Sequence, residues 1–272
     1  MNFFHAIVLG AIEGITEFLP VSSTFHLIFT GKFLGLPSDE FLKFFEVFIQ
    51  SGAIAAVALL FLAELKNTSP PMAEDQGLLH NVIISFIPTA IIGFILHTVI
   101  KNIIFEKDLL LISASFFIGL VFIVAEIFIK KGYLRTNLPI SKLTIKGALL
   151  IGLFQSLAVI PGVSRSGATI LGLLILGFNR SEAAIYSFLL AIPTIISASA
   201  LDLAKTPLSV LTSNHIALLS AGFISSFIFA HFSAHWLIEF LKKHTLIPFG
   251  IYRIILSAIL FFIFLSSRIA LP

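Results

Sequence analysis

Six apolar stretches, each close to the length of a membrane-spanning helix, constrain this 272-residue chain more than any other feature. About 20 apolar residues in a helix cross the hydrocarbon core of a bilayer. Charged residues make up only 11% of the chain, whereas soluble domains carry about 25%. We therefore expect an all-α, multi-pass membrane protein. The stretches cover about residues 41–63, 80–100, 106–129, 182–203, 215–239 and 247–267.

Two further apolar regions, 3–36 and 144–178, are interrupted midway by proline, glycine, serine and charged residues. Interrupted helices are tolerated at membrane depth only where protein buries them or where they line a wet cavity. These two regions are therefore the best candidates for the functional part of the chain.

The two interrupted regions also resemble each other, which indicates an internal repeat. Three full spans follow each region, so two units, about 1–129 and 144–267, have inverted topologies if each interrupted region enters and leaves on one face. Interrupted segments at matching places in two halves point to a binding site between them. Aligning residues 10–24 with 152–166 pairs Glu13 with Gln155 and Ser22 with Ser164.

Basic residues concentrate in the segment 130–146, which holds no acidic residue. The positive-inside rule makes this segment cytoplasmic, and counting spans then places both termini outside. The net charge of +3 is small, and the basic residues lie in loops between apolar runs. This pattern suits anionic membrane lipids as partners and argues against nucleic acid.

The first interrupted region carries two carboxylates, Glu13 and Glu17, which share one helix face because they lie four residues apart. Such carboxylates are costly in an apolar segment unless they are paired, protonated or bound to a metal. The pair suggests one group for proton transfer and one for holding a cation. Gly10 and Gly14 would allow another backbone to approach closely.

Pro20 ends this first half-helix, and hydroxyl residues then begin a second one. They are Ser22, Ser23 and Thr24, and His26 follows within one helical turn of Ser23. A kink capped by hydroxyl groups would explain the serines and the threonine equally well. It would not explain two glutamates and a histidine, because ionisable groups at membrane depth are functional by default.

The second interrupted region has the features of an anion site. A Pro-Gly turn at 161–162 precedes residues that can open a helix with free N–H groups. Arg165 adds a permanent charge whose planar fork suits phosphate oxygens. Ser164, Ser166 and Thr169 add hydroxyl donors around it. The alternative is an arginine that reaches the interface from an ordinary helix end, but the turn and the hydroxyls fit that account poorly.

Together the two motifs resemble the bacterial undecaprenyl-diphosphatase family, whose members are also called bacitracin-resistance proteins. The first motif is Glu-Gly-x-Thr-Glu-Phe-Leu-Pro-Val-Ser-Ser-Thr-x-His at 13–26, and the second is Pro-Gly-x-Ser-Arg-Ser-Gly-Ala-Thr at 161–169. The hydropathy layout matches over nearly the whole chain. At one position the chain departs from the family, since Phe25 stands where glycine usually precedes the histidine.

This resemblance implies six transmembrane helices and two re-entrant helical hairpins in inverted repeats, in the inner (plasma) membrane of a bacterium. It implies a phosphatase that hydrolyses undecaprenyl diphosphate to undecaprenyl phosphate and inorganic phosphate, which recycles the lipid carrier of peptidoglycan synthesis and confers resistance to bacitracin. The site would open to the periplasm or exterior. The family's functional residues fall on Glu13, Glu17, Ser23, His26 and Arg165.

For the mechanism, we expect the diphosphate to bind between the two interrupted segments. Arg165 and the hydroxyl and N–H groups of 164–169 would hold phosphate, with Ser22 and Thr24 contributing from the other side. Glu13 and Glu17 would hold a divalent cation, Mg²⁺ or Ca²⁺.

Three routes for attack on phosphorus stay open at this point. Ser23 attacks with His26 or Glu17 as its base, an activated water attacks, or His26 forms a phosphohistidine. The first two are favoured over the third.

Other functions and sites also fit parts of these patterns. A secondary transporter or flippase of a polyprenyl phosphate lipid would also use inverted repeats with broken helices, and a homodimer is an open alternative for the assembly. An intramembrane protease or another type of lipid phosphatase would partly fit the glutamate pair and the arginine, but neither fits the full serine-rich motifs. Glu46 and Gln50 are candidate neighbours of the site. His231, His235 and Glu239 share a helix stripe that could mimic a metal site, although an interfacial helix end is the simpler interpretation.

Overall fold

The computed structural model describes residues 1–37, 39–67, 76–99, 108–205 and 212–269. Over these residues all regular secondary structure is helical, apart from an isolated β-bridge between Leu138 and Phe178. In chain order the helices are α1 (Phe3–Thr16), α2 (Ser23–Phe33), α3 (Glu40–Asn67), α4 (Gln76–Val99), α5 (Asp108–Lys130), η2 (Ile140–Lys142), α6 (Ile145–Ser156), η3 (Leu157–Val159), α7 (Arg165–Ile175), α8 (Arg180–Lys205), α9 (Ser213–Lys243) and α10 (Ile247–Ile269).

Within the described ranges, six helices are long and apolar enough to cross a membrane, namely α3, α4, α5, α8, α9 and α10. Each coincides with one of the six predicted stretches, so the prediction of an all-α, polytopic membrane protein is confirmed. Large apolar side chains such as Phe94, Phe232 and Phe262 lie exposed on these helices. Lipid, in place of water, is the solvent that matches such a surface.

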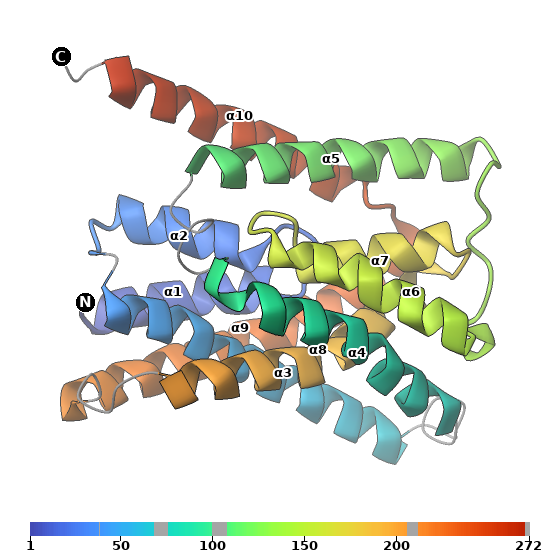
Figure 1. Ribbon diagram of the computed structural model, residues 1–272, viewed down its shortest axis with the longest axis horizontal. Helices are drawn as coiled ribbons and strands as arrows, with labels where there is room; N and C mark the ends of the chain where they lie inside the picture. The colour runs from blue at the N-terminus through green and yellow to red at the C-terminus, as the bar shows by residue number, and fades with distance from the viewer. Residues whose placement is uncertain (38, 68–75, 100–107, 206–211, 270–272) are drawn as a thin grey trace.

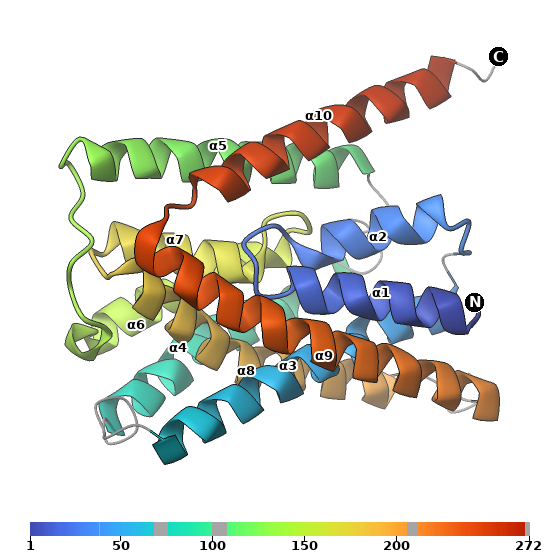
Figure 2. The same ribbon diagram turned by 180° about the vertical axis from the view of Figure 1, so that it is seen from behind.

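The two interrupted regions form helical hairpins. In Figures 1 and 2, α1 and α2 lie side by side and run in opposite directions, and α6 and α7 do the same. The turn of the first hairpin covers 17–22 and the turn of the second covers 160–164. Three long helices follow each hairpin, so the same order of elements occurs twice along the chain. The inverted relation of the two units stays a prediction.

Close backbone contacts hold the first hairpin against α9. A Cβ added to Gly10 or Gly14 would collide with the carbonyl oxygen of Gly222 or Ser226, both in α9. The predicted close approach at these two glycines is therefore present, and α9 is the helix that makes it. In the second hairpin, Gly152 meets α4 in the same way.

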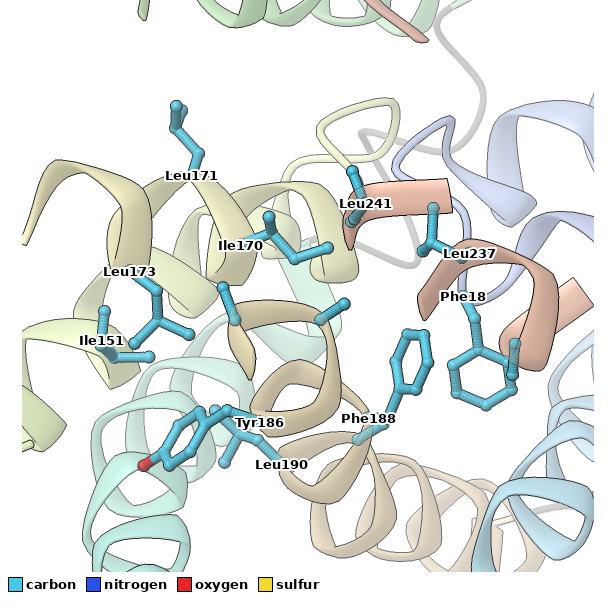
Figure 3. Close-up of a cluster of buried hydrophobic side chains, with 14 of the residues drawn as sticks. Phe18, Ile151, Ile170, Leu171, Leu173, Tyr186, Phe188, Leu190, Leu237 and Leu241 are labelled. Carbon is cyan, nitrogen blue, oxygen red and sulfur yellow. The ribbon is translucent and has the colours of Figure 1, made fainter. Parts of the chain in front are cut away.

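The largest buried cluster lies where the second hairpin packs on α8 and the end of α9 (Figure 3). Ile170 and Leu173 of α7 face this cluster, and Phe18 reaches it from the turn of the first hairpin. The rings of Phe18 and Phe188 meet edge to face, with their centroids 4.8 Å apart. This packing fixes the first turn on the same helix that supports the second hairpin.

Candidate active site

The turns of the two hairpins meet inside the protein. The hydroxyl of Ser166, at the start of α7, donates to the carbonyl of Leu19 in the first turn at 3.0 Å. Ser166 is fully buried, so this contact is shielded from solvent. Residues about 150 positions apart in the sequence thereby come together at one place.

Both turns end in the same uncommon backbone conformation. Ser22 has φ of 73° and Ser164 has φ of 77°, and no other non-glycine residue in the described ranges has a positive φ. Such a conformation is disfavoured for residues with a Cβ and concentrates at functional sites. Each serine directly precedes a helix, α2 or α7, whose first N–H groups therefore begin at the meeting point.

Three charged or polar side chains from the two hairpins form one connected group. Ser23 Oγ donates to Glu17 Oε2 at 2.5 Å, and Arg165 Nη2 donates to Glu17 Oε1 at 3.1 Å. Arg165 Nη1 also donates to the carbonyl of Ser187 at 2.9 Å. The carboxylate thus receives a hydroxyl proton donor on one oxygen and a guanidinium on the other.

A cavity of about 750 Å³ adjoins this group. Glu17, the hydroxyl residues 22–24, Ser164 and Arg165 line one part of it. Apolar residues of α4 and α8 line much of the remainder, among them Phe86, Ala90, Ile91, Phe94, Ile195 and Ala198. The cavity therefore offers a small polar region beside a larger apolar one, which suits an amphipathic ligand with an anionic head.

Glu13 lies apart from the cavity wall and is completely buried. Neither of its carboxylate oxygens has a hydrogen-bond partner among the described residues. Over the same residues, no group of three or more histidine, aspartate or glutamate side chains is arranged to hold a metal ion. Two unpaired oxygens one helical turn from Glu17 nevertheless fit a divalent cation, because Mg²⁺ usually takes one or two carboxylates and completes its shell with water and substrate phosphates.

Two predicted phosphate ligands take other positions. Ser166 and Thr169 are fully buried and do not line the cavity. Ser166 ties the two turns together, as described above. Thr169 Oγ1 donates to the carbonyl of Arg165 at 2.9 Å and lies 3.4 Å from Gln155 Oε1. In this conformation both hydroxyls support the backbone around Arg165, and their direct contact with phosphate stays a prediction.

His26 also points away from the cavity, toward α10. Its Nδ1 lies 2.7 Å from the carbonyl oxygen of Ser22, and its Nε2 lies 2.7 Å from the hydroxyl of Tyr252. Because a carbonyl oxygen can only accept, Nδ1 carries a proton, and in the neutral ring Nε2 accepts from the tyrosine. The histidine therefore holds the turn at Ser22, and its predicted catalytic role is not tested by this geometry.

Arg253 is a central residue that the sequence interpretation missed. Its side chain is buried, and Nη1 donates to the carbonyl of Pro20 at 3.1 Å, while Nη2 donates to the carbonyl of Gly162. Its Nε donates to the carbonyl of Ser115 at 3.2 Å. One cation thus joins both turns to α5. An arginine inside the apolar stretch 247–267 was itself a signal, by the same rule that singled out the two glutamates.

Phe25, the departure from the family pattern, packs away from the cavity. It is buried in a cluster with Leu111, Ile112 and Leu260, which belong to α5 and α10. Its ring also packs on Phe29 one turn later, at 4.9 Å between centroids. The larger side chain therefore fills space behind α2 and leaves the polar region of the cavity open.

The remaining candidates divide into two groups. Gln50 of α3 lines the cavity, whereas Glu46 does not. Among the exposed residues of α9, Glu239 pairs with Lys242 at 2.5 Å. Over the described ranges, the histidines of this stripe belong to no group of three or more histidine, aspartate or glutamate side chains that could hold a metal ion. An interfacial helix end stays the simpler interpretation of this stripe.

The fold and the site define an all-α, polytopic membrane protein with a buried acid, hydroxyl and guanidinium group beside an amphipathic cavity. Comparison with known proteins then identifies the family, because the family model described as "Bacitracin resistance protein BacA" matches residues 6–259. The chain belongs to this family.

Curated relatives extend over nearly the whole chain. A protein of Aquifex aeolicus named undecaprenyl-diphosphatase is 43% identical over 267 residues, which cover 97% of this chain and 100% of the relative. Proteins with the same name from Persephonella marina and Thermus thermophilus are 45% and 41% identical, and cover 95% and 97% of this chain and 98% of each relative. The resemblance of the two motifs to this family is therefore confirmed.

Proposed function

We propose that this protein is an undecaprenyl-diphosphate phosphatase, which hydrolyses undecaprenyl diphosphate to undecaprenyl phosphate and inorganic phosphate. The observation that carries the proposal is the contact of Glu17 with both Ser23 and Arg165 at the polar part of the cavity. The names of the relatives support the substrate and the reaction, and the family description supports a role in bacitracin resistance. The product would re-enter cell-wall synthesis as the lipid carrier.

The diphosphate binds between the two helix N-termini. Helices α2 and α7 begin at Ser23 and Arg165, and both residues line the cavity. Free N–H groups and the positive ends of two helix dipoles favour an anion there. Arg165 turns from Glu17 toward phosphate oxygens, or donates to both, and stabilises the negative charge that develops on the transferred group. Ser22, Thr24 and Ser164 add hydroxyl donors along the wall.

Ser23 is the nucleophile in this mechanism, and Glu17 is its base. Glu17 takes the proton from Ser23 Oγ, which attacks the terminal phosphorus. The bond between that phosphorus and the bridging oxygen breaks, and undecaprenyl phosphate leaves with the proton that Glu17 passes to its oxygen. Water then attacks the phosphoserine and gives a proton to the ionised Glu17, which returns it to Ser23 Oγ as the bond between phosphorus and that oxygen breaks and inorganic phosphate departs. Direct attack by a water bound to Glu17 is the alternative, and it needs no covalent intermediate.

A divalent cation, Mg²⁺ or Ca²⁺, is part of the proposal. Glu13 and Glu17 would hold it beside the diphosphate, where it would neutralise phosphate charge. The unpaired oxygens of Glu13 support this assignment.

The proposed membrane is the bacterial plasma membrane, with re-entrant hairpins that enter it from opposite sides and a site that opens outward. Residues of α8 between Thr194 and Asp202, toward the end of that helix, line the cavity. The basic segment 130–146 lies at the opposite end, where Thr136 accepts from Arg180 at the start of α8. If the basic segment is cytoplasmic, the cavity faces the periplasm or exterior.

The test is phosphate release from undecaprenyl diphosphate by detergent-purified protein. We expect the wild type to release phosphate, and Glu17→Ala and Arg165→Ala to release none above background while remaining folded. Ser187→Ala is the matched control, because it keeps the carbonyl that accepts from Arg165 and removes a hydroxyl that has no partner among the described residues. A folded wild type that binds the lipid without releasing phosphate would reject the enzyme and favour a transporter or flippase of the same lipid.

A further inference from the structure

The cavity opens sideways as well as toward the polar group. Ile91 and Phe94 line it, yet they are 54% and 72% exposed on the outside of the protein. Ser197 and Ala198 of α8 also line it and are exposed. Ile91 and Phe94 lie within the apolar span of α4, Gly77–Leu96. In a bilayer, this lateral opening between α4 and α8 would therefore face lipid.

Gly93 lies at this opening and is unlike the glycines that serve helix packing. A Cβ added to Gly52 or Gly152 would collide with a backbone carbonyl of a neighbouring helix. A Cβ added to Gly93 would meet no described atom within 4 Å. Glycine inside a helix costs about 1 kcal/mol relative to alanine. Among the described residues, no close helix contact at Gly93 offsets that cost, so the open space itself needs an explanation.

The size of the proposed lipid substrate offers an explanation for the open space at Gly93. Pockets for drug-sized ligands have volumes of about 300–1,000 Å³, and this cavity, at about 750 Å³, is in that range. A chain of eleven isoprene units is far larger than such a ligand. With the diphosphate at Arg165, most of the chain must leave the cavity, and it stays out of water only by leaving into lipid.

We infer that the isoprenoid chain of the substrate crosses the wall of the cavity at Gly93, and that the absence of a side chain there keeps the lateral opening wide enough for a long polyprenyl chain. The inference rests on the proposed function for its substrate. It adds a residue that selects for chain length and lies outside both sequence motifs. Bulk at this position should obstruct long chains and leave the phosphate site intact.

The first experiment uses the absence of cysteine from the natural chain. Gly93→Cys and Ile95→Cys each introduce a single thiol into the full-length protein, whose alkylation by N-ethylmaleimide in detergent is followed by mass spectrometry. Ile95 is the matched control, because it is 68% exposed on the same helix and does not line the cavity. The probes are undecaprenyl phosphate, which is not consumed, and inorganic pyrophosphate, which has no chain.

We expect undecaprenyl phosphate at about ten times its Kd to slow alkylation of Gly93→Cys about tenfold. Pyrophosphate should leave that rate unchanged, and neither probe should protect Ile95→Cys. Bound undecaprenyl phosphate that leaves Gly93→Cys unprotected, or that protects both thiols equally, overturns the inference. Protection in a protein that releases no phosphate would retain the chain path and reject the phosphatase, so the two failures are distinguishable.

The second experiment separates long from short substrates. We expect Gly93→Leu to raise the KM for undecaprenyl diphosphate about tenfold, a modest loss for one obstructed apolar contact, with kcat unchanged. Its kcat/KM for isopentenyl diphosphate, whose chain is a single isoprene unit, should equal that of the wild type, as should both values for Ile95→Phe. Equal losses for both substrates, or no loss for either, would contradict the assigned path.

Discussion

The two hairpins share a backbone design and differ in chemistry. Each has a turn that ends in a serine with positive φ, Ser22 or Ser164, and each then begins a helix at the cavity. The alignment of the two regions pairs these serines. In the first hairpin the next residue is Ser23, and in the second it is Arg165. The same position thus presents the proposed nucleophile from one side and a cation from the other.

The first helices of the two hairpins also carry a matched pair of residues, Glu13 and Gln155, which differ in their hydrogen bonding. Gln155 Nε2 donates to Thr89 and Thr194 at 3.0 and 3.1 Å. Its counterpart Glu13 is equally buried and has no hydrogen-bond partner among the described residues. Buried polar groups are normally paired, so the exception agrees with the role in cation binding that we propose for Glu13. The second hairpin is hydrogen-bonded at this position, whereas the first holds a buried carboxylate that is not.

The largest effect should come from removing the chemistry of the first hairpin. Ser23→Ala and Glu17→Gln should each lower kcat by about 10³-fold or more, because nucleophile and base act as one unit. For the same reason the double variant should be no worse than either single one. Phosphate release under saturating lipid measures this. If kcat of Ser23→Ala were within a few-fold of the wild-type value, serine would not be the nucleophile, and attack by water would be the mechanism.

A smaller loss is expected at the matching position of the second hairpin. Arg165→Lys keeps a charge but loses the fork that reaches both Glu17 and the carbonyl of Ser187. We expect kcat/KM to fall about 10²-fold, in the range found when one transition-state donor is removed. Steady-state kinetics beside Arg165→Ala measure it. If the lysine variant matched the wild type, the fork would be irrelevant and only the charge would matter.

Arg253 tests whether the two turns must be held together. We expect Arg253→Met to lower kcat about 10-fold to 100-fold with a much smaller change in KM, since a displacement near 1 Å can cost that much. Arg253→Lys should recover part of the loss, because an ammonium can still bind one of the two turn carbonyls. The apparent unfolding temperature of each variant serves as the control for a purely structural effect. A folded Arg253→Met with normal kcat would contradict a positioning role.

Much of this arrangement could be predicted from sequence, because it depends on composition and local chemistry. Apolar length gives the six spanning helices, and Pro20 and the turn at 161–162 mark where the two other regions break. Charges that are expensive in lipid single out Glu13, Glu17 and Arg165 as candidates, and the fold brings Glu17 and Arg165 into contact at the cavity. The internal resemblance brings the two regions to one place before any coordinates are known.

The rest depends on tertiary packing that no local pattern encodes. Arg253 lies in an apolar stretch far from either motif, and only the fold brings it to both turns. Ser166 and Thr169 look like phosphate ligands in the motif, but they face the protein interior. Tyr252 belongs to neither motif, and only the fold brings its hydroxyl to His26. Side-chain direction at a turn decides these cases, and residue type alone does not specify it.

The smallest effect should appear in stability and should have opposite signs in the two hairpins. Glu13→Gln replaces an unpaired buried carboxylate by a neutral amide and should stabilise the apoprotein by about 1–3 kcal/mol. Gln155→Glu replaces an amide that donates to Thr89 and Thr194 by a carboxylate, and should destabilise it by a similar amount. The apparent unfolding temperature in detergent with a chelator measures both changes.

Added Mg²⁺ or Ca²⁺ then decides what normally satisfies Glu13. If a divalent cation is its partner, the ion should raise the unfolding temperature of the wild type and have no effect on Glu13→Gln, because an amide is a much weaker ligand for such an ion. Equal responses would remove Glu13 from the cation site. If Glu13→Gln is less stable than the wild type even with a chelator, the carboxyl group already has a favourable partner. Glu13 and Gln155 would then differ in chemical reactivity and not in how well the protein stabilises them.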